Sequence, residues 1–126
     1  MRAYAWSAKG DKVQMMQDLD EAIEVSPKNS SVWSNRAWLL ATSPNDDHLN
    51  GKLALAAATR AMELPMWSEF RVLDVLAAAY AEAGDFEQAV KWQTKVVDML
   101  PPTQRADYEA RLDLYRERKP YREPLP

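Results

Sequence analysis

Apolar residues recur at helical spacing along most of the chain, and short polar or proline-containing stretches separate the groups. The clearest unit runs from about residue 70 to 102 and holds two such stripes, divided by Ala83-Gly84-Asp85. The first stripe consists of Leu73, Leu76, Ala77 and Tyr80, and the second of Phe86, Ala89, Val90, Val96, Val97 and Leu100. Gly84 allows a tight turn, and Asp85 is suited to cap the helix behind it. This pattern predicts a helical hairpin.

Three segments of the chain end in an apolar residue that a proline follows closely. The apolar ends lie 39 and 35 residues apart, at Val25, Leu64 and Met99, and the prolines are Pro27, Pro65 and Pro101. Proline cannot continue a helix, so each one marks a helix end. The spacing indicates a repeated helix pair and disfavours a single long coiled coil or a conventional four-helix bundle.

The unit from residue 70 to 102 resembles a tetratricopeptide repeat, a helix–turn–helix unit of about 34 residues. The residues at the family's signature positions are Leu73, Leu76, Ala77, Tyr80, Gly84, Phe86, Ala89, Val96 and Pro101. Gln93 departs from the pattern, because it stands where an aromatic residue is usual. The resemblance implies an all-α fold: an α-α superhelix (a TPR-like solenoid) of about seven helices with a C-terminal capping helix. Ala77 and Ala89 would let two helices approach closely.

The resemblance covers residues 1–118, divided into a partial repeat (1–29), a repeat with an inserted loop (30–66), a third repeat (67–102) and the capping helix (103–118). Residues 119–126 form a Pro-rich tail. The inserted loop is rich in Pro, Asn, Asp, Ser and Gly. Tyr108, Leu112 and Tyr115 make a narrow apolar stripe on the capping helix, and charged residues surround it, as the end of a repeat array requires. The chain is similar to the C-terminal repeats of large bacterial tetratricopeptide proteins, and its start in mid-repeat is what a segment of a longer protein would show.

Composition excludes several classes of function. The 126 residues are 47% apolar and 28% charged, with a net charge of −3, as in a globular domain. This balance offers no basic surface for nucleic acid, and no apolar run reaches the roughly 20 residues of a membrane-spanning helix. The first residues lack the apolar stretch of a signal peptide, so a cytoplasmic location is the default expectation. The absence of cysteine removes disulfides and thiolate metal sites.

The sequence offers little for catalysis or metal binding. His48 is the one histidine and stands beside Asp46 and Asp47 in the inserted loop, whereas a metal site needs three or four ligands in fixed geometry. We expect His48 to be solvated, and Asp46 or Asp47 to favour the N-terminus of the next helix. Capping and turn chemistry explains most serines, and the carboxylates are spread over helix faces. We therefore predict no enzyme activity, no cofactor and no metal site.

The resemblance also implies a binding surface, because the first helix of each tetratricopeptide repeat lines a concave face. Carried over by position, the candidate peptide-binding residues are Tyr4, Ser34, Asn35, Trp38, Arg71, Asp74 and Ala78. Trp38 would anchor the ligand and Arg71 would contact acidic groups, since aromatic residues and arginine supply much of the binding energy at interfaces. The alternative is that Trp38 only packs on its neighbours. Asn35 and Arg71 match two positions of a clamp for C-terminal carboxylates found in some family members, but Tyr4 and Val75 leave that clamp incomplete.

These patterns favour a protein–protein interaction module that binds a peptide or protein partner in a concave helical groove. Two alternatives stay open. One is a structural spacer or C-terminal cap of a longer repeat protein, and the other is a self-associating module that forms a homodimer through the incomplete N-terminal repeat. Binding to nucleic acid and insertion into a membrane are not expected. Fold-level resemblance does not identify the partner.

Overall fold

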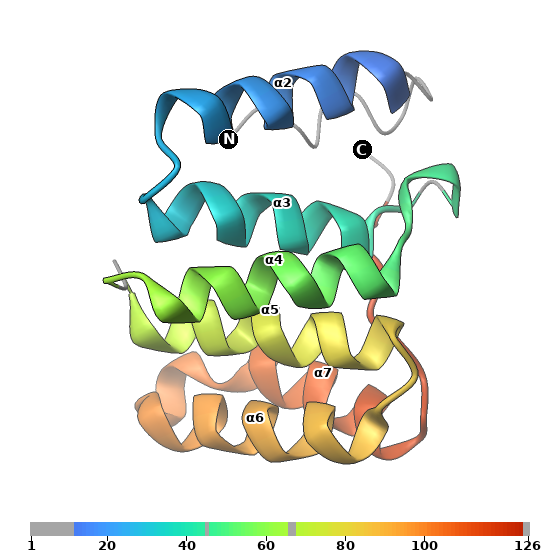
Figure 1. Ribbon diagram of the computed structural model, residues 1–126. Helices are drawn as coiled ribbons and strands as arrows, with labels where there is room; N and C mark the ends of the chain where they lie inside the picture. The colour runs from blue at the N-terminus through green and yellow to red at the C-terminus, as the bar shows by residue number, and fades with distance from the viewer. Residues whose placement is uncertain (1–11, 45, 66–67, 125–126) are drawn as a thin grey trace.

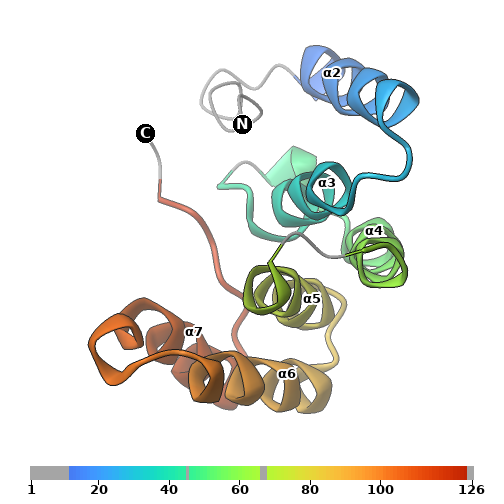
Figure 2. The same cartoon turned by 90° about the vertical axis from the view of Figure 1, so that its left-hand side faces the viewer.

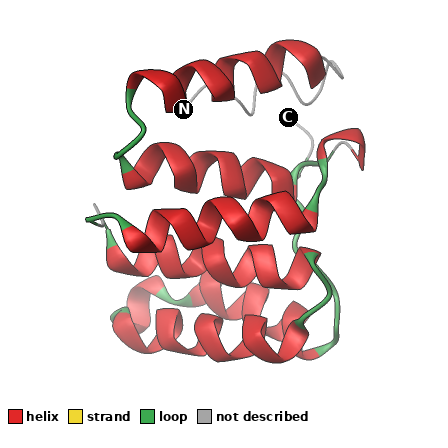
Figure 3. Ribbon diagram, in the orientation of Figure 1, coloured by secondary structure: helices red, strands yellow, loops and turns green. Residues whose placement is uncertain are grey.

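The computed structural model describes residues 12–44, 46–65 and 68–124 (Figures 1 and 3). The predicted all-α class is confirmed, because the regular elements are all helices in this part of the chain. Its elements in chain order are α2 (Lys12–Val25), α3 (Ser30–Thr42), the short 3-10 helix η1 (Asp46–His48), α4 (Gly51–Glu63), α5 (Glu69–Glu82), α6 (Phe86–Met99), the 3-10 helix η2 (Pro102–Gln104) and α7 (Ala106–Arg116). The further helix expected at the N-terminus falls before residue 12, outside the described residues. None of the described helices is long and apolar enough to cross a membrane.

The C-terminal ends of α2, α4 and α6 and the start of α6 lie where the sequence predicted them. Helices α2, α4 and α6 each end two residues before a proline, at Pro27, Pro65 and Pro101 respectively. Proline has no N–H to donate and its ring clashes with the preceding turn, so a helix stops short of it. At the start of α6 the Asp85 side chain accepts a hydrogen bond from the Gln88 N–H (3.2 Å), which confirms its predicted capping role.

The N-terminus of α4 is capped by a residue that the sequence reasoning did not single out. The Asn50 side chain accepts a hydrogen bond from the Leu53 N–H at 3.0 Å. The prediction that Asp46 or Asp47 would favour this terminus is wrong, because both belong to η1 and α4 has no acidic residue in its first turn. A neutral side-chain oxygen thus satisfies a helix N–H where a charge–dipole contact was expected.

The inserted loop between α3 and α4 packs onto the domain. The prediction of a solvated His48 is wrong: the side chain is buried, and its Nδ1 lies 3.1 Å from Ser43 Oγ. The Asn50 N–H donates to the carbonyl of Leu40 at 2.9 Å and draws the end of the loop against α3. The loop thus buries the His48 side chain while the two aspartates before it and Asn50 stay exposed.

Consecutive helices from α3 to α7 pack against each other, and α3 also packs against α5. In Figure 2, α3 and α5 stand one above the other with α4 to one side, while α6 and α7 lie below. Small residues fill these contacts and let the helices come close. The buried alanines are Ala37, Ala41, Ala54, Ala57, Ala58, Ala61, Ala77, Ala78, Ala79, Ala81 and Ala89.

The predicted hairpin of α5 and α6 is confirmed, and α7 closes it at the end. Ala77 and Ala89 are fully buried in one cluster with Tyr115 of α7. Tyr80 and Phe86 pack beside this cluster, as the pattern predicted. The two alanines leave room for the large ring, so α7 packs along α6 while its Tyr115 side chain reaches Ala77 of α5.

Gly51, the first residue of α4, lies tightly against the C-terminal end of α5. A Cβ atom at this position would stand 2.7 Å from both Cα and N of Ala83 and 2.7 Å from the carbonyl carbon of Glu82. Those are backbone atoms at the end of a helix, and they do not move aside as a flexible side chain would. Only a residue without a Cβ fits.

Replacing Gly51 with alanine is expected to lower the free energy of unfolding by about 1–3 kcal/mol, because the added methyl group forces two packed helices apart. Urea denaturation followed by circular dichroism measures the change. Lys52→Ala, at the neighbouring exposed position, is the matched control and is expected to shift stability by less than about 0.5 kcal/mol. Equal stability of the Gly51→Ala variant and the wild type would contradict the tight contact.

Candidate functional site

Helices α3, α5 and α7 surround a polar cavity of about 230 Å³, which we call the α3–α5–α7 cavity. Its lining residues are Ser34, Asn35, Trp38, Arg71, Asp74, Val75, Tyr108, Arg111 and Glu123. On α3 and on α5 these residues are three or four positions apart or adjacent, so each helix contributes one side to the cavity. Segments far apart in sequence thus meet at one place.

Five of the seven residues predicted to bind a peptide lie around this cavity, namely Ser34, Asn35, Trp38, Arg71 and Asp74. Ala78 is buried in the main hydrophobic core, and Tyr4 lies outside the described residues. The structure therefore brings five of the candidates together at one cavity, while their part in binding stays a prediction.

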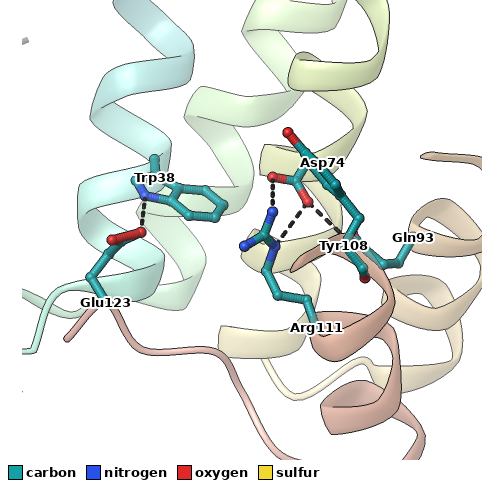
Figure 4. Close-up of polar contacts among 6 residues, drawn as sticks. All are labelled: Trp38, Asp74, Gln93, Tyr108, Arg111 and Glu123. Carbon is teal, nitrogen blue, oxygen red and sulfur yellow. Dashed lines mark hydrogen bonds and ion pairs between the residues drawn. The ribbon is translucent and has the colours of Figure 1, made fainter. Parts of the chain in front are cut away.

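Asp74 of α5 is a buried carboxylate with three hydrogen-bond donors around it (Figure 4). Arg111 of α7 donates from Nε to Oδ1 at 3.2 Å and from Nη2 to Oδ2 at 3.3 Å, a two-point contact. Gln93 of α6 donates from Nε2 to the same Oδ1 at 3.0 Å and to the backbone carbonyl of Tyr108 at 3.0 Å. This network joins the last three helices.

Burial is the largest influence on the Asp74 carboxyl and raises its pKa above the ordinary value, although the Arg111 guanidinium and the Gln93 amide act in the opposite direction. At Asp74 the loss of hydration outweighs the attraction to Arg111, whereas at Arg111 burial is outweighed by the attraction of its neighbours, Asp74 first among them, which raises the pKa of the guanidinium. The pair fixes the position of α7 relative to α5. Moving α7 away would leave a buried charge without its partner.

Three aromatic rings surround the Arg111 guanidinium. Its Cζ lies 4.8 Å from the ring centroid of Tyr108, 5.1 Å from that of Tyr121 and 5.5 Å from that of Trp38. Cations are attracted to aromatic faces at such distances. Trp38 is only 8% exposed, and its ring also packs against Tyr121 with centroids 5.8 Å apart. In this structure Trp38 packs on its neighbours.

The segment that covers Trp38 is the protein's own C-terminal tail, residues 119–124. The Trp38 indole Nε1 donates to Glu123 Oε1 at 3.2 Å (Figure 4), and the Glu123 N–H donates to the carbonyl of Thr42 at 2.7 Å. Figure 2 shows the tail leaving the α7 end of the molecule and passing α5 and α3. The predicted Pro-rich tail is therefore part of the cavity wall.

Sequence reasoning missed three participants, Gln93, Arg111 and Glu123. Gln93 carried a signal, because it was the polar exception in an apolar stripe, and it is fully buried. Arg111 was one charged residue among many on the capping helix, and nothing distinguished it. Glu123 lies in a tail whose path depends on contacts with α3, which no local pattern reveals.

Volume alone would favour a different region, an open hollow of about 930 Å³ along α4 and the end of α5. Its lining includes the exposed residues Lys52, Thr59 and Arg60. The convergence of buried polar groups and aromatic rings distinguishes the α3–α5–α7 cavity from it. No group of three or more His, Asp or Glu side chains in the described part of the chain is arranged to hold a metal ion.

Replacing Asp74 with leucine is expected to lower the free energy of unfolding by about 3–5 kcal/mol, because Arg111 would stay buried without a carboxylate. The double variant Asp74→Leu/Arg111→Met is expected to regain most of that loss, since two apolar side chains need no hydration. Asp113→Ala, which breaks the exposed ion pair with Arg116, is the control and should change stability by less than about 1 kcal/mol. Urea denaturation gives all three values, and a double variant no more stable than Asp74→Leu would refute this account.

Burial of Tyr115 predicts that the free energy of unfolding falls at alkaline pH. Its side chain is fully buried, its hydroxyl has no hydrogen-bond partner among the described residues, and burial raises its pKa well above the ordinary value. The unfolded chain therefore releases this proton near pH 10 while the folded chain keeps it, and the free energy of unfolding falls as pH rises further, by up to ~1.4 kcal/mol per pH unit.

Tyr115→Phe is expected to be as stable as the wild type or slightly more stable at neutral pH, because it removes an unpaired buried hydroxyl. Above about pH 10 it should lose less stability than the wild type, since it has no phenol to ionise on unfolding. Urea denaturation at both pH values makes the comparison. The same alkaline loss in both proteins would show that Tyr115 is not the group responsible.

Compared with protein-family models, with curated proteins and with solved structures, the chain has no match in any of the three. Function is therefore inferred from the residues of the α3–α5–α7 cavity and from the sequence patterns.

Proposed function

We propose that this protein is an interaction module that binds an extended peptide or protein segment in the α3–α5–α7 cavity. The observation that carries the proposal is the convergence of Ser34, Asn35, Trp38, Arg71 and Asp74 on one cavity. Binding sites of this kind combine apolar and aromatic walls with a few polar groups that fix the ligand's orientation. No reaction chemistry is assigned to the cavity.

The polar groups at the cavity suit a peptide. The Ser34 hydroxyl is buried without a hydrogen-bond partner among the described residues, and a ligand amide or carbonyl would supply one. Asn35 is partly exposed and its amide both donates and accepts hydrogen bonds. Two arginines, Arg71 and Arg111, and two carboxylates, Asp74 and Glu123, line the cavity, so a ligand that carries both acidic and basic groups finds partners there.

The tetratricopeptide resemblance supports the same assignment. Helices α3 and α5 begin the two repeats expected at 30–66 and 67–102, and α7 occupies the place of the capping helix. In that family the first helices line the concave face of an α-α superhelix. We propose the same architecture for this chain, with the α3–α5–α7 cavity as part of its concave face.

The proposal is tested by replacing two cavity residues whose side chains are not buried, in the double variant Asn35→Ala/Arg71→Glu. Immobilised wild type and variant are exposed to cell lysate, captured proteins are identified by mass spectrometry, and the bound segment is then titrated by calorimetry. At least a tenfold loss of affinity is expected, about 1.4 kcal/mol or more. Thr59→Ala/Arg60→Glu makes a similar change of charge on α4 and is the matched control.

Each outcome decides something. A partner that the cavity variant still binds with wild-type affinity places binding elsewhere and refutes the proposal. Failure of the wild type to capture any protein favours the alternative, a spacer or C-terminal cap of a longer repeat protein. Capture of a second copy of the same chain favours self-association.

A further inference from the structure

The tail makes the kinds of contact that a bound peptide would make in the α3–α5–α7 cavity. Its backbone donates a hydrogen bond from the Glu123 N–H to Thr42 O (2.7 Å), and its Glu123 carboxylate accepts one from Trp38 Nε1 (3.2 Å). The ring of Tyr121 packs against both the Trp38 ring, with centroids 5.8 Å apart, and the Arg111 guanidinium, whose Cζ lies 5.1 Å from its centroid. Backbone pairing combined with side-chain contacts is the usual basis of recognition of an extended peptide.

A defined turn directs the tail toward the cavity. After α7 the Lys119 N–H donates to Leu114 O (2.9 Å) and the Arg118 N–H to Tyr115 O (3.0 Å), the bond pattern of a Schellman motif. Arg118 has φ of 61°, in the left-handed region that favours glycine, and its guanidinium lies over the ring of Phe86 at 5.2 Å. The chain reversal is thus held in place by several contacts at once.

Prolines stiffen the segment that enters the cavity. Pro120 and Pro124 bracket Tyr121, Arg122 and Glu123. Each proline fixes its own φ and keeps the residue before it out of the helical region. A segment restricted in this way loses less conformational entropy when it is bound, so a few contacts suffice to hold it.

The tail also completes the end of α3. The last carbonyls of a helix have no partner within the helix. Here Thr42 O accepts from the Glu123 N–H, and Ala41 O accepts from Arg122 Nη1 at 3.2 Å. Any ligand that replaces the tail therefore has to bring its own donors to these two carbonyls, or leave them to water.

The tail lies on the core without being part of it. Tyr121, Arg122 and Glu123 are all partly exposed, and none is among the buried core residues. Arg122 Nη1 lies 2.7 Å from Glu82 Oε1, with the two side chains 34% and 15% exposed, so this ion pair has to break when the tail leaves. The segment is well placed and only partly buried, which is the condition for exchange with a competing ligand.

From these contacts we infer that the tail is a built-in competitor for the cavity, and that the partner is an extended peptide of the same chemistry: an aromatic, a basic and an acidic side chain in succession. The partner's acidic group takes the place of the Glu123 carboxylate on the Trp38 indole, and its aromatic ring takes the place of Tyr121 beside Arg111. Asn35 and Arg71 line the same cavity and belong to the surface that the partner contacts. The inference rests on the proposed function and adds to it the ligand class and the regulation of the site.

The test uses the full chain and a synthetic peptide of residues 119–126, Lys-Pro-Tyr-Arg-Glu-Pro-Leu-Pro. The variant Tyr121→Ala/Glu123→Ala loosens the tail, and Lys119→Ala, which alters only an exposed tail residue, is the matched control. The readout is the indole N–H cross-peak of Trp38 in ¹H–¹⁵N correlation NMR spectra of ¹⁵N-labelled protein. The cross-peak is assigned by its loss in Trp38→Phe. A short tether gives the wild-type tail an effective concentration on the order of 1 mM, so the peptide should bind the loosened variant at least tenfold more tightly than the wild type.

The expected result has three parts. The Trp38 signal moves in the loosened variant, the added peptide returns it toward its wild-type position, and a peptide with Glu123→Gln does so at least tenfold less well. Wild type and Lys119→Ala stay unchanged over the same peptide range. Should the double variant lose helicity by circular dichroism, Glu123→Gln alone in the full chain gives the same comparison with a milder change.

Two results would overturn the inference. One is an unmoved Trp38 signal in the loosened variant, or a signal that the peptide does not restore. The other is equal binding of the peptide to wild type and loosened variant. If either occurs while Asn35→Ala/Arg71→Glu still loses its captured partner, the proposed function stands and only the ligand class and the competition by the tail are wrong.

Discussion

A buried carboxylate on α5 constrains how the last two helices, α6 and α7, can pack. Asp74 has lost most of its hydration, and its oxygens need donors that α5 itself does not supply. Arg111 and Gln93 provide them from α7 and α6, and Gln93 also holds the backbone of Tyr108. Packing of apolar faces would allow α7 to settle at several positions, whereas this network is satisfied at one. The same arrangement puts a guanidinium among aromatic rings at the wall of the cavity.

The features that sequence predicted well are those set by local chemistry. Helix ends at Pro27, Pro65 and Pro101 follow from a missing N–H and a steric clash, and the cap at Asp85 follows from the donors that a helix start leaves open. The close contact at Ala77 and Ala89 follows from small residues at helical spacing. None of these needs knowledge of the rest of the chain.

The features that escaped prediction depend on partners far away in sequence. Asp74 and Arg111 are 37 residues apart, and Trp38 and Glu123 are 85 apart, so neither pair leaves a periodic trace. His48 was expected in solvent because its neighbours are polar, yet a bond with Ser43 and the fold of the loop bury it. Charge and polarity along a sequence predict exposure on average, and they fail at the positions where a polar group has found a specific partner.

Gln93 shows how little chemistry separates a stable helix interface from a repulsive one. Its amide nitrogen faces two acceptors, Asp74 Oδ1 and the carbonyl of Tyr108. Deamidation would replace that nitrogen with oxygen and keep almost the same volume, but the two attractive contacts would become two repulsions between lone pairs, one of them between carboxylates. This position therefore requires glutamine for its N–H donors, since glutamate has nearly the same size and shape. Because the side chain is fully buried, water that would hydrolyse the amide is kept away, so the packing also slows the chemical ageing to which it is most sensitive.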